Sequence, residues 1–346
     1  MILPSHSLID NCFAGTSLEP ASPPGLIVLG GQSVDGPLSS VETFGFEDDN
    51  NCNIPKLPET RYGFAAFKTF SNQLAVCGGW WEGKPDSTDC LTLDQSKALW
   101  VRGAFKGSLS GEGVRGVASF EDHGIHIIHS WSTSFLENGD DTWVQGIRTP
   151  IEVECACKVS DSSFVIVGSN SRENVFEYSV TNQLWEDADT WPAMITKRKG
   201  PGCAATSQFL MVAGGVTDQG EVLASVEIFR LDSKSLGRAA NMSSPRSFFS
   251  LVPVGLIRPR LLAIGGRNEA SFTKRTEFYD EEENQWEEGP QLGAERSSFG
   301  AIMIEGKITC TENLPSHSCP TTEPSGKTCA FSDNEGTFFK RAHDGL

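Results

Sequence analysis

The stretch Leu26-Ile-Val-Leu-Gly-Gly31 is a short apolar run closed by two glycines, and the chain repeats it. Three clear copies lie at residues 74–79, 209–215 and 261–266, and two weaker copies lie at 125–130 and 164–169. The first small or turn position of each copy follows the previous one by 39 to 51 residues. A repeat of that size indicates a supersecondary unit that packs on its neighbours, so this repeat decides the fold.

Each unit continues in the same order after the glycines. A polar loop leads to a second run rich in β-branched or aromatic residues, such as Val41-Glu-Thr-Phe44 or Val226-Glu-Ile-Phe229, and such runs predict strands. A tryptophan follows in four units, as Trp100, Trp143, Trp185 and Trp286. A basic residue then precedes a strand of small residues, and these basic residues are Arg61, Arg115, Lys199, Arg246 and Arg296.

This combination resembles the Kelch repeat of β-propellers, as found in the propeller portion of Kelch-like proteins without their BTB domain. The glycine pairs that carry the resemblance are Gly30 and Gly31, Gly78 and Gly79, Gly214 and Gly215, and Gly265 and Gly266. The resemblance covers about residues 25 to 306 and is weaker in the third and fourth units, where His129-Ser130 and Gly168-Ser169 replace the glycine pair. It implies four-stranded blades arranged radially around a channel.

The order of the strands predicts six blades. The first clear strand, 26–29, resembles the second strand of a blade, and the last, 299–304, resembles an inner first strand. A ring closes if this last strand joins the first blade, and closure removes the open sheet edges. We therefore expect an all-β protein with an N-terminal segment over 1–24, a Kelch propeller over 25–306 and a cysteine-containing tail over 307–346. The alternative is seven blades with a degenerate last blade.

Composition limits the classes of partner. The formal net charge of −17 argues against nucleic acid, whose binding depends on Lys and Arg at the phosphates. No apolar stretch approaches the roughly 20 residues that span a bilayer, so membrane insertion is not expected. Residues 1–10 have no basic start and no apolar core, so no secretory signal is visible. We expect a cytoplasmic protein, or an extracellular one if the N-terminus is incomplete; the sequence predicts no oligomeric state.

Ten cysteines leave the redox state open. Cys77 ends the second strand of the second blade and Cys90 begins the third, so antiparallel pairing would bring them close to each other. They are a candidate disulfide, and the alternative is two buried thiols that pack as small apolar side chains. The chain has no C-x-x-C motif, so a structural zinc is not expected.

The motifs do not predict an enzyme. The chain has no G-x-S-x-G elbow, phosphate loop or H-E-x-x-H motif. His126 and His129 lie in a predicted strand, where a spacing of three places them on opposite faces, so they should not share a metal. We expect no catalytic residue, no metal and no cofactor. Two alternatives stay open, a secreted disulfide-braced propeller with an extracellular structural or recognition role, and a cryptic oxidase or hydrolase.

Binding is the expected function, because propellers work through loops held on a rigid ring. Arginine grips carboxylates with two hydrogen bonds, and exposed tryptophan with arginine is typical of interaction hot spots. We therefore expect a scaffold or substrate-receptor type propeller that binds a protein or an acidic peptide on one loop face. The residues expected on that face are Arg61, Arg115, Lys199, Arg246, Arg296, Arg267, Trp80 and Trp131. The alternative is that the basic residues pair with carboxylates of the chain itself.

Overall fold

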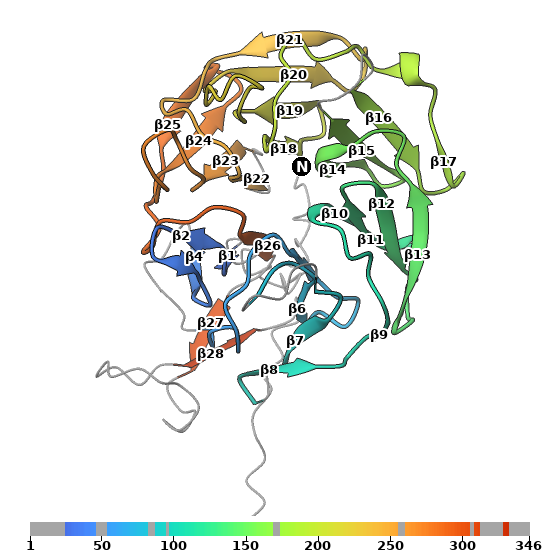
Figure 1. Ribbon diagram of the computed structural model, residues 1–346, viewed down its shortest axis with the longest axis vertical. Helices are drawn as coiled ribbons and strands as arrows, with labels where there is room; N and C mark the ends of the chain where they lie inside the picture. Colours follow the sequence, from blue (N-terminus) through green and yellow to red (C-terminus); the bar gives the residue numbers. More distant parts are fainter. Residues whose placement is uncertain are drawn as a thin grey trace, which may run out of the picture.

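The computed structural model describes residues 25–45, 54–81, 87–94, 97–168, 174–254, 260–304, 308–311 and 328–331. The expected N-terminal segment and most of the expected tail lie outside these residues. Six sheets stand around a central channel, with their first strands innermost (Figure 1). The inner strands contact one another in a closed ring, in the order β5, β10, β14, β18, β22, β26 and back to β5. The chain is therefore a six-bladed β-propeller, as the repeat predicts.

The blades follow the sequence in order. The first combines β26 (Gly300–Ile304), β1 (Gly25–Leu29) and β4 (Val41–Gly45). The second has β5 (Ala65–Lys68), β6 (Leu74–Cys77), β7 (Cys90–Asp94) and β8 (Leu99–Arg102). The third has β10 (Val114–Phe120), β11 (Gly124–His129), β12 (Ser132–Leu136) and β13 (Thr142–Arg148), with β9 (Lys106–Gly107) added parallel to β13.

The last three blades are regular. The fourth has β14 (Val153–Ser160), β15 (Ser163–Gly168), β16 (Val175–Ser179) and β17 (Leu184–Trp185). The fifth has β18 (Gly202–Ala205), β19 (Phe209–Ala213), β20 (Val226–Arg230) and β21 (Leu236–Ala239). The sixth has β22 (Ser250–Val254), β23 (Arg260–Ile264), β24 (Thr276–Asp280) and β25 (Gln285–Glu288).

Two two-stranded sheets and one short helix lie outside the main strands of the blades. β2 (Gln32–Ser33) and β3 (Gly36–Pro37) form a hairpin in the first blade, and η1 (Ala188–Thr190) is a short 3-10 helix. β27 (Ile308–Thr311) pairs with β28 (Thr328–Phe331) in a separate sheet. Among the described residues, no helix is long and apolar enough to cross a membrane.

The C-terminal strand closes the ring. β26 pairs antiparallel with β1, which places Ile304 opposite Gly25 and Gly300 opposite Leu29. The first blade therefore joins the two ends of the propeller, as expected from the strand order. Three of its strands are described, whereas each other blade has at least four described strands, and residues 46–53 lie outside the description.

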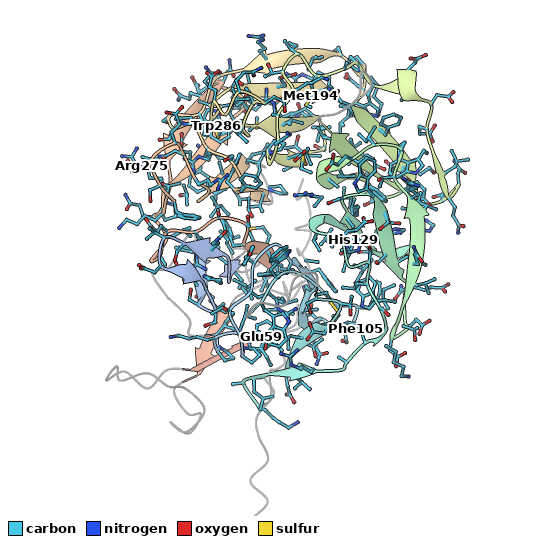
Figure 2. The ribbon with its side chains drawn as sticks, viewed as in Figure 1. Glu59, Phe105, His129, Met194, Arg275 and Trp286 are labelled. Atoms are coloured by element: carbon cyan, nitrogen blue, oxygen red, sulfur yellow. A yellow bond between two sulfur atoms is a disulfide. The ribbon has the colours of Figure 1, made fainter. Side chains whose placement is uncertain are left out.

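Apolar cores lie between neighbouring blades rather than within one sheet. Ile27 and Leu29 of the first blade pack with Val76 and Leu91 of the second, and corresponding clusters fill the other five contacts between described blades. Because both faces of a blade are covered, its second strand is a continuous apolar run. Trp286 lies in the outer part of the sixth blade (Figure 2), and its indole Nε1 donates to the carbonyl oxygen of Ala240 in the fifth. This tryptophan therefore connects two adjacent blades.

The glycine pairs are required by backbone geometry. All eight glycines of the four clear pairs have φ between 54° and 100°, a region that other residues rarely adopt. A Cβ on Gly79 would also stand 2.6 Å from the carbonyl oxygen of Tyr62 in the same blade. The pair lets the turn lie directly against the entry to the inner strand.

Candidate functional site

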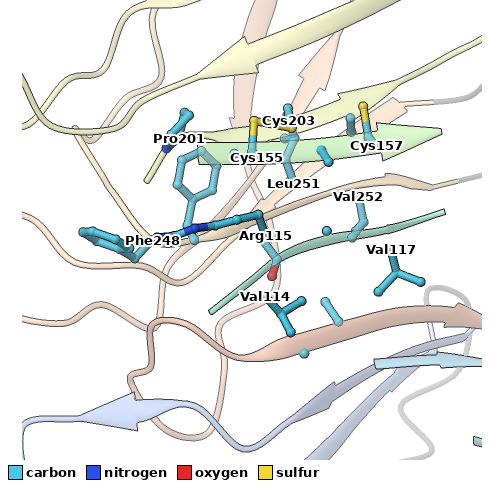
Figure 3. Close-up of a pocket in the computed structure, with 18 of the residues that line it drawn as sticks. Val114, Arg115, Val117, Cys155, Cys157, Pro201, Cys203, Phe248, Leu251 and Val252 are labelled. Carbon is cyan, nitrogen blue, oxygen red and sulfur yellow. A yellow bond between two sulfur atoms is a disulfide. The ribbon is translucent and has the colours of Figure 1, made fainter. Parts of the chain in front are cut away.

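One end of the central channel is built from equivalent positions of the blades. Gly63, Gly200, Phe248 and Ser298 each lie two residues after the position of the repeated arginine, and all have φ between 51° and 64°. Their backbones are linked from blade to blade: Gly63 N donates to Ser298 O (2.7 Å), Ser298 N to Phe248 O (2.9 Å), and Phe248 N to Gly200 O (2.8 Å). We call these four residues and Arg115 the channel mouth; all five line a cavity of about 440 Å³ (Figure 3).

The chain of backbone bonds gives way to side chains in the fourth and third blades. Gly200 N donates instead to the carboxylate Oε2 of Glu154, at 3.0 Å. In the third blade, Arg115 lies at a shift in the pairing register between β10 and β11, as Glu154 does between β14 and β15 in the fourth. At these two blades, side chains therefore stand at the channel mouth where the other four blades contribute backbone groups.

Arg115 is the cation of the channel mouth. Its Nε donates to the hydroxyl of Ser130 at 3.2 Å, and the side chain is half-buried. Within the described residues, its two terminal guanidinium nitrogens have no hydrogen bond or ion pair. They can therefore take up a carboxylate without first breaking an internal pair.

Three of the other predicted arginines are not available to a partner. The side chains of Arg61, Arg246 and Arg296 are 0% exposed, and each has an internal carboxylate. Arg246 donates to the carbonyls of Gly265 (3.0 Å) and Arg275 (2.9 Å) and forms an ion pair with Glu277. The prediction that these three arginines face a partner is wrong, because a buried guanidinium needs a counter-charge inside the protein. The alternative, pairing within the chain, is what the structure contains.

The repeated ion pair has a simple register. The partner glutamate lies on the third strand, opposite the second-strand residue that comes two before the first glycine, as Glu277 lies opposite Ala263 and Glu42 opposite Val28. Burial lowers the pKa of Arg246 and Arg296, and the paired carboxylate opposes that shift. The glutamates also bind the loop that precedes the repeated arginine. The carboxylate of Glu277 accepts a hydrogen bond from the backbone amide of Ser243 (2.6 Å).

In the fifth blade, the repeated position is held by Arg198 and not by the predicted Lys199. Arg198, which was not predicted, is the buried arginine there and pairs with Glu227 at 2.6 Å, while Lys199 is exposed and pairs with Asp218 at 3.0 Å. The signal was present, because Arg198 precedes Gly200 by two residues as Arg61 precedes Gly63. Lys199 stays on the exposed face, adjacent to the channel mouth.

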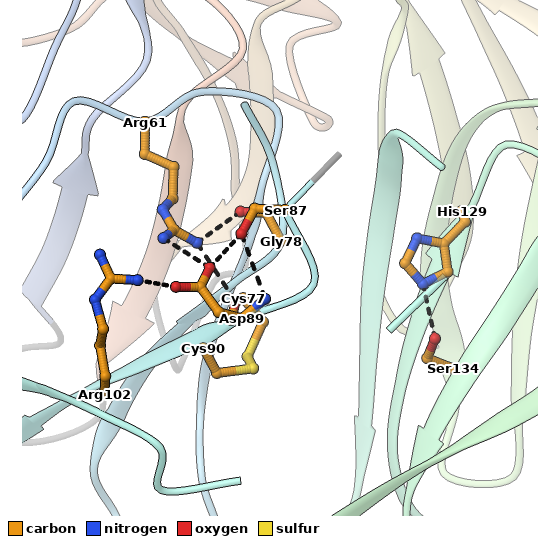
Figure 4. The surroundings of a disulfide bond; sticks show 9 residues. All are labelled: Arg61, Cys77, Gly78, Ser87, Asp89, Cys90, Arg102, His129 and Ser134. Carbon is orange, nitrogen blue, oxygen red and sulfur yellow. Dashed lines mark hydrogen bonds and ion pairs between the residues drawn. A yellow bond between two sulfur atoms is a disulfide. The ribbon is translucent and has the colours of Figure 1, made fainter. Parts of the chain in front are cut away.

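The second blade replaces the third-strand glutamate by a network of four charges, of which Figure 4 draws Arg61, Asp89 and Arg102. Arg61 contacts Glu59 (2.5 Å) and Asp89 (3.0 Å), and both carboxylates also pair with Arg102. Burial alone would raise the pKa of Asp89, but the hydrogen bond from Ser87 and the charges of the two arginines lower it. Nearby, Cys77 and Cys90 face each other across β6 and β7 in a disulfide, with their Cα atoms 4.1 Å apart (Figure 4).

The third blade uses a neutral pair where other blades have ions. Ser134 lies opposite Ile127, the register position of the glutamates, and its hydroxyl meets Nε2 of His129 at 2.9 Å (Figure 4). His129 is buried, and burial lowers its pKa, so it stays neutral. Within the described residues, no group of three or more His, Cys, Asp or Glu side chains could hold a metal.

Aromatic side chains and a second arginine surround the channel mouth. Trp80 and Trp131 are 43% and 39% exposed and occupy the position just after the turn of their units. The Trp80 ring stacks on Tyr62, beside Gly63, with centroids 6.1 Å apart. The exposed Arg267 lies over the ring of Phe248, 4.9 Å from its centroid. We call the channel mouth with Trp80, Trp131, Arg267 and Lys199 the mouth face.

Comparisons with known proteins agree with the architecture. A Kelch motif family model matches residues 249–293. Kelch-like protein 41b of Danio rerio is 23% identical over 150 residues, which cover 42% of this chain and 24% of that protein. Kelch-like protein 15 of Mus musculus is 31% identical over 147 residues, which cover 41% of this chain and 23% of that protein.

The matched stretch spans about a quarter of the length of each of these curated relatives. The repeat, the closed ring of six blades and these matches support one another. Together they support a Kelch-repeat β-propeller family for this chain.

Proposed function

We propose that this propeller is a non-enzymatic interaction module that binds an acidic segment of a partner protein on the mouth face, with Arg115 as the principal contact. The observation that carries the proposal is the unpaired end of Arg115 among the described residues, at the opening of a channel to which four other blades contribute backbone groups. The Kelch-like relatives support a protein-binding role at the level of the family.

The electrostatic setting favours a carboxylate ligand at Arg115. The charges of the buried arginines are neutralised by Glu42, Glu227, Glu277 and Glu59. These arginines therefore add little to the electrostatic field at the surface. Glu154, the nearby acid, already accepts the amide of Gly200. A guanidinium in a partly enclosed site forms stronger hydrogen bonds to a carboxylate than one in open water.

Trp80 and Trp131 supply the apolar part of the proposed contact. They flank the second and third blades on the side where Arg115 lies, since Arg115 bonds to Ser130 and Trp131 is the next residue. Large rigid aromatic rings give contact area at a small cost in conformational entropy. We therefore expect the ligand to present an acidic side chain next to an apolar one.

The test is a binding titration with a fluorescein-labelled hexaglutamate peptide. Arg115→Ala should weaken binding at least tenfold, because a hydrogen bond to a charged group contributes about 1.5–3 kcal/mol. Arg238→Ala removes the same charge from the exposed outer strand β21 and should change the affinity less than about twofold. Both variants should keep the melting temperature of the parent.

Two results would refute the proposal. The parent protein would fail to bind the hexaglutamate peptide, or Arg115→Ala and Arg238→Ala would bind it equally well while both stay folded. Trp80→Ala tests the apolar contact separately, using a peptide in which a leucine follows each glutamate. If Trp80→Ala binds that peptide as the parent does, the aromatic part of the site is wrong.

A further inference from the structure

A second disulfide joins two blades at the channel wall. Cys155 lies on the inner strand β14 of the fourth blade and Cys203 on the inner strand β18 of the fifth, with their Cα atoms 6.1 Å apart (Figure 3). Both residues line the channel cavity. The Cys77–Cys90 bond differs in kind, because it links two strands of one blade.

The position of this bond coincides with a gap in the backbone chain of the channel mouth. From Gly63 through Ser298 and Phe248 to Gly200, each blade is linked to the next by a backbone hydrogen bond. Between the fifth and fourth blades, the link is the side-chain bond from Gly200 N to Glu154. Cys155 is the residue after Glu154, and Cys203 comes three residues after Gly200. The disulfide therefore joins the fourth and fifth blades next to the point where the backbone links of the mouth end and a side-chain link takes over.

We propose that the Cys155–Cys203 bond is a reducible tie that fixes the fourth and fifth blades at the channel mouth, and that its reduction loosens the mouth and weakens ligand binding there. The disulfide and its effect on the channel mouth do not depend on the proposed function. The effect of reduction on ligand binding rests on the proposed function.

The chemistry requires an external reductant, and a low-molecular-weight thiol such as glutathione is the proposed class. Cys203 is partly exposed to the cavity, whereas Cys155 is 5% exposed, so the thiolate attacks the sulfur of Cys203. A mixed disulfide forms on Cys203, the bond to Cys155 breaks, and Cys155 leaves as a thiolate that takes a proton. A second thiol attacks the mixed disulfide, which releases Cys203 and the oxidised dimer of the reductant.

Cys157 is the neighbouring thiol, but it does not serve as the internal reductant. It lies two residues after Cys155 on the same strand and also lines the cavity. Burial raises the pKa of the Cys157 thiol to about 12, so at neutral pH it is protonated and a poor nucleophile. The redox state of the tie is therefore set by the surrounding thiol pool.

The test first establishes that the disulfide is present and then measures local opening at the channel mouth. Free thiols of the native protein are alkylated, and a non-reducing peptide map should contain the Cys155–Cys203 crosslink. Hydrogen exchange of peptides containing Gly200 is then followed with and without reduced glutathione, because the Gly200 amide donates to Glu154. Reduction should speed exchange roughly tenfold in the parent, by local opening. The Cys155→Ser/Cys203→Ser variant should exchange fast in both states.

The matched control is Cys77→Ser/Cys90→Ser, which keeps the tie and removes the bond within the second blade. It should respond to glutathione at Gly200 as the parent does. A map without the crosslink, or a parent whose Gly200 exchange ignores glutathione, would overturn the tie.

Binding is measured last, with the labelled hexaglutamate peptide in oxidised and reduced parent protein. Reduction should weaken binding several-fold. Unchanged affinity despite faster Gly200 exchange would overturn the regulatory part alone. If the peptide never binds but Gly200 still responds to glutathione, the proposed function fails and the tie stands.

Discussion

Replacement of Arg246 by methionine tests the internal arginine–glutamate pairs most directly. Methionine fills much of the same space but removes the guanidinium that bonds to Gly265 O, Arg275 O and Glu277. Glu277 is 3% exposed, so its carboxylate would remain in the interior, and among the described residues the amide of Ser243 would be its one remaining bonded partner.

The expected loss follows from that burial. Removing one partner of a buried ion pair costs about 3–5 kcal/mol, because the remaining charge is uncompensated. At about 2 °C per kcal/mol for a domain of this size, Arg246→Met should melt about 6–10 °C below the parent. Calorimetry and urea unfolding at neutral pH measure both quantities.

The control is Arg267→Met, nearby in the same blade. Arg267 is exposed and contacts the ring of Phe248, so its loss should cost less than about 1 kcal/mol. Arg246→Met/Glu277→Leu removes both charges and should be more stable than Arg246→Met alone, since no charge is left unpaired. If Arg246→Met melts together with Arg267→Met, the reasoning about the buried pairs is refuted.

Two further predictions concern the ring. Burial lowers the pKa of His126 from 6.5 to about 4. Between these two pH values, His126 is protonated in the unfolded chain but not in the folded protein. The free energy of unfolding should therefore fall by about 2 kcal/mol at pH 5. His126→Phe, in a cluster that already holds Phe120 and Phe164, should remove this part of the fall in urea titrations at pH 7.5 and 5; an unchanged fall would assign it to other groups. Gly79→Ala should destabilise the protein by more than about 1 kcal/mol, whereas Gly139→Ala, at the same φ of 83° with nothing within 4 Å of its Cβ, should cost less; equal losses would show that contact with the Tyr62 carbonyl is unimportant.

Local patterns in the sequence favoured six blades over seven, and the structure has six. The glycine pairs mark a turn that only glycine adopts readily, and the apolar run before them marks a strand covered on both faces. Strand order then required the last strand to close the ring, as β26 does with β1. Where the pattern was weak, in the third and fourth blades, the strands still form, because the apolar clusters between blades do not need the glycines.

The candidate site was harder to predict, because exposure is not a local property. Arg61, Arg246 and Arg296 share their place in the repeat with Arg198, and a single sequence does not show whether that place points into a blade or out of it. The third-strand glutamates Glu42, Glu227 and Glu277 lie far in the sequence from the arginines with which they pair. The sequence therefore did not reveal these ion pairs. Lys199 was chosen in place of Arg198 for the same reason.

The sequence by itself determined the all-β class, the repeat length and the closing strand, and it favoured six blades over seven, since these depend on turn geometry and on apolar periodicity that each residue expresses locally. Only the tertiary structure decided which of the predicted cations are neutralised inside the protein. That choice depends on packing the blades in a circle, which buries four arginines against carboxylates of their own blades. The same packing places Arg115, at a register shift of its inner strand, at the opening of the channel.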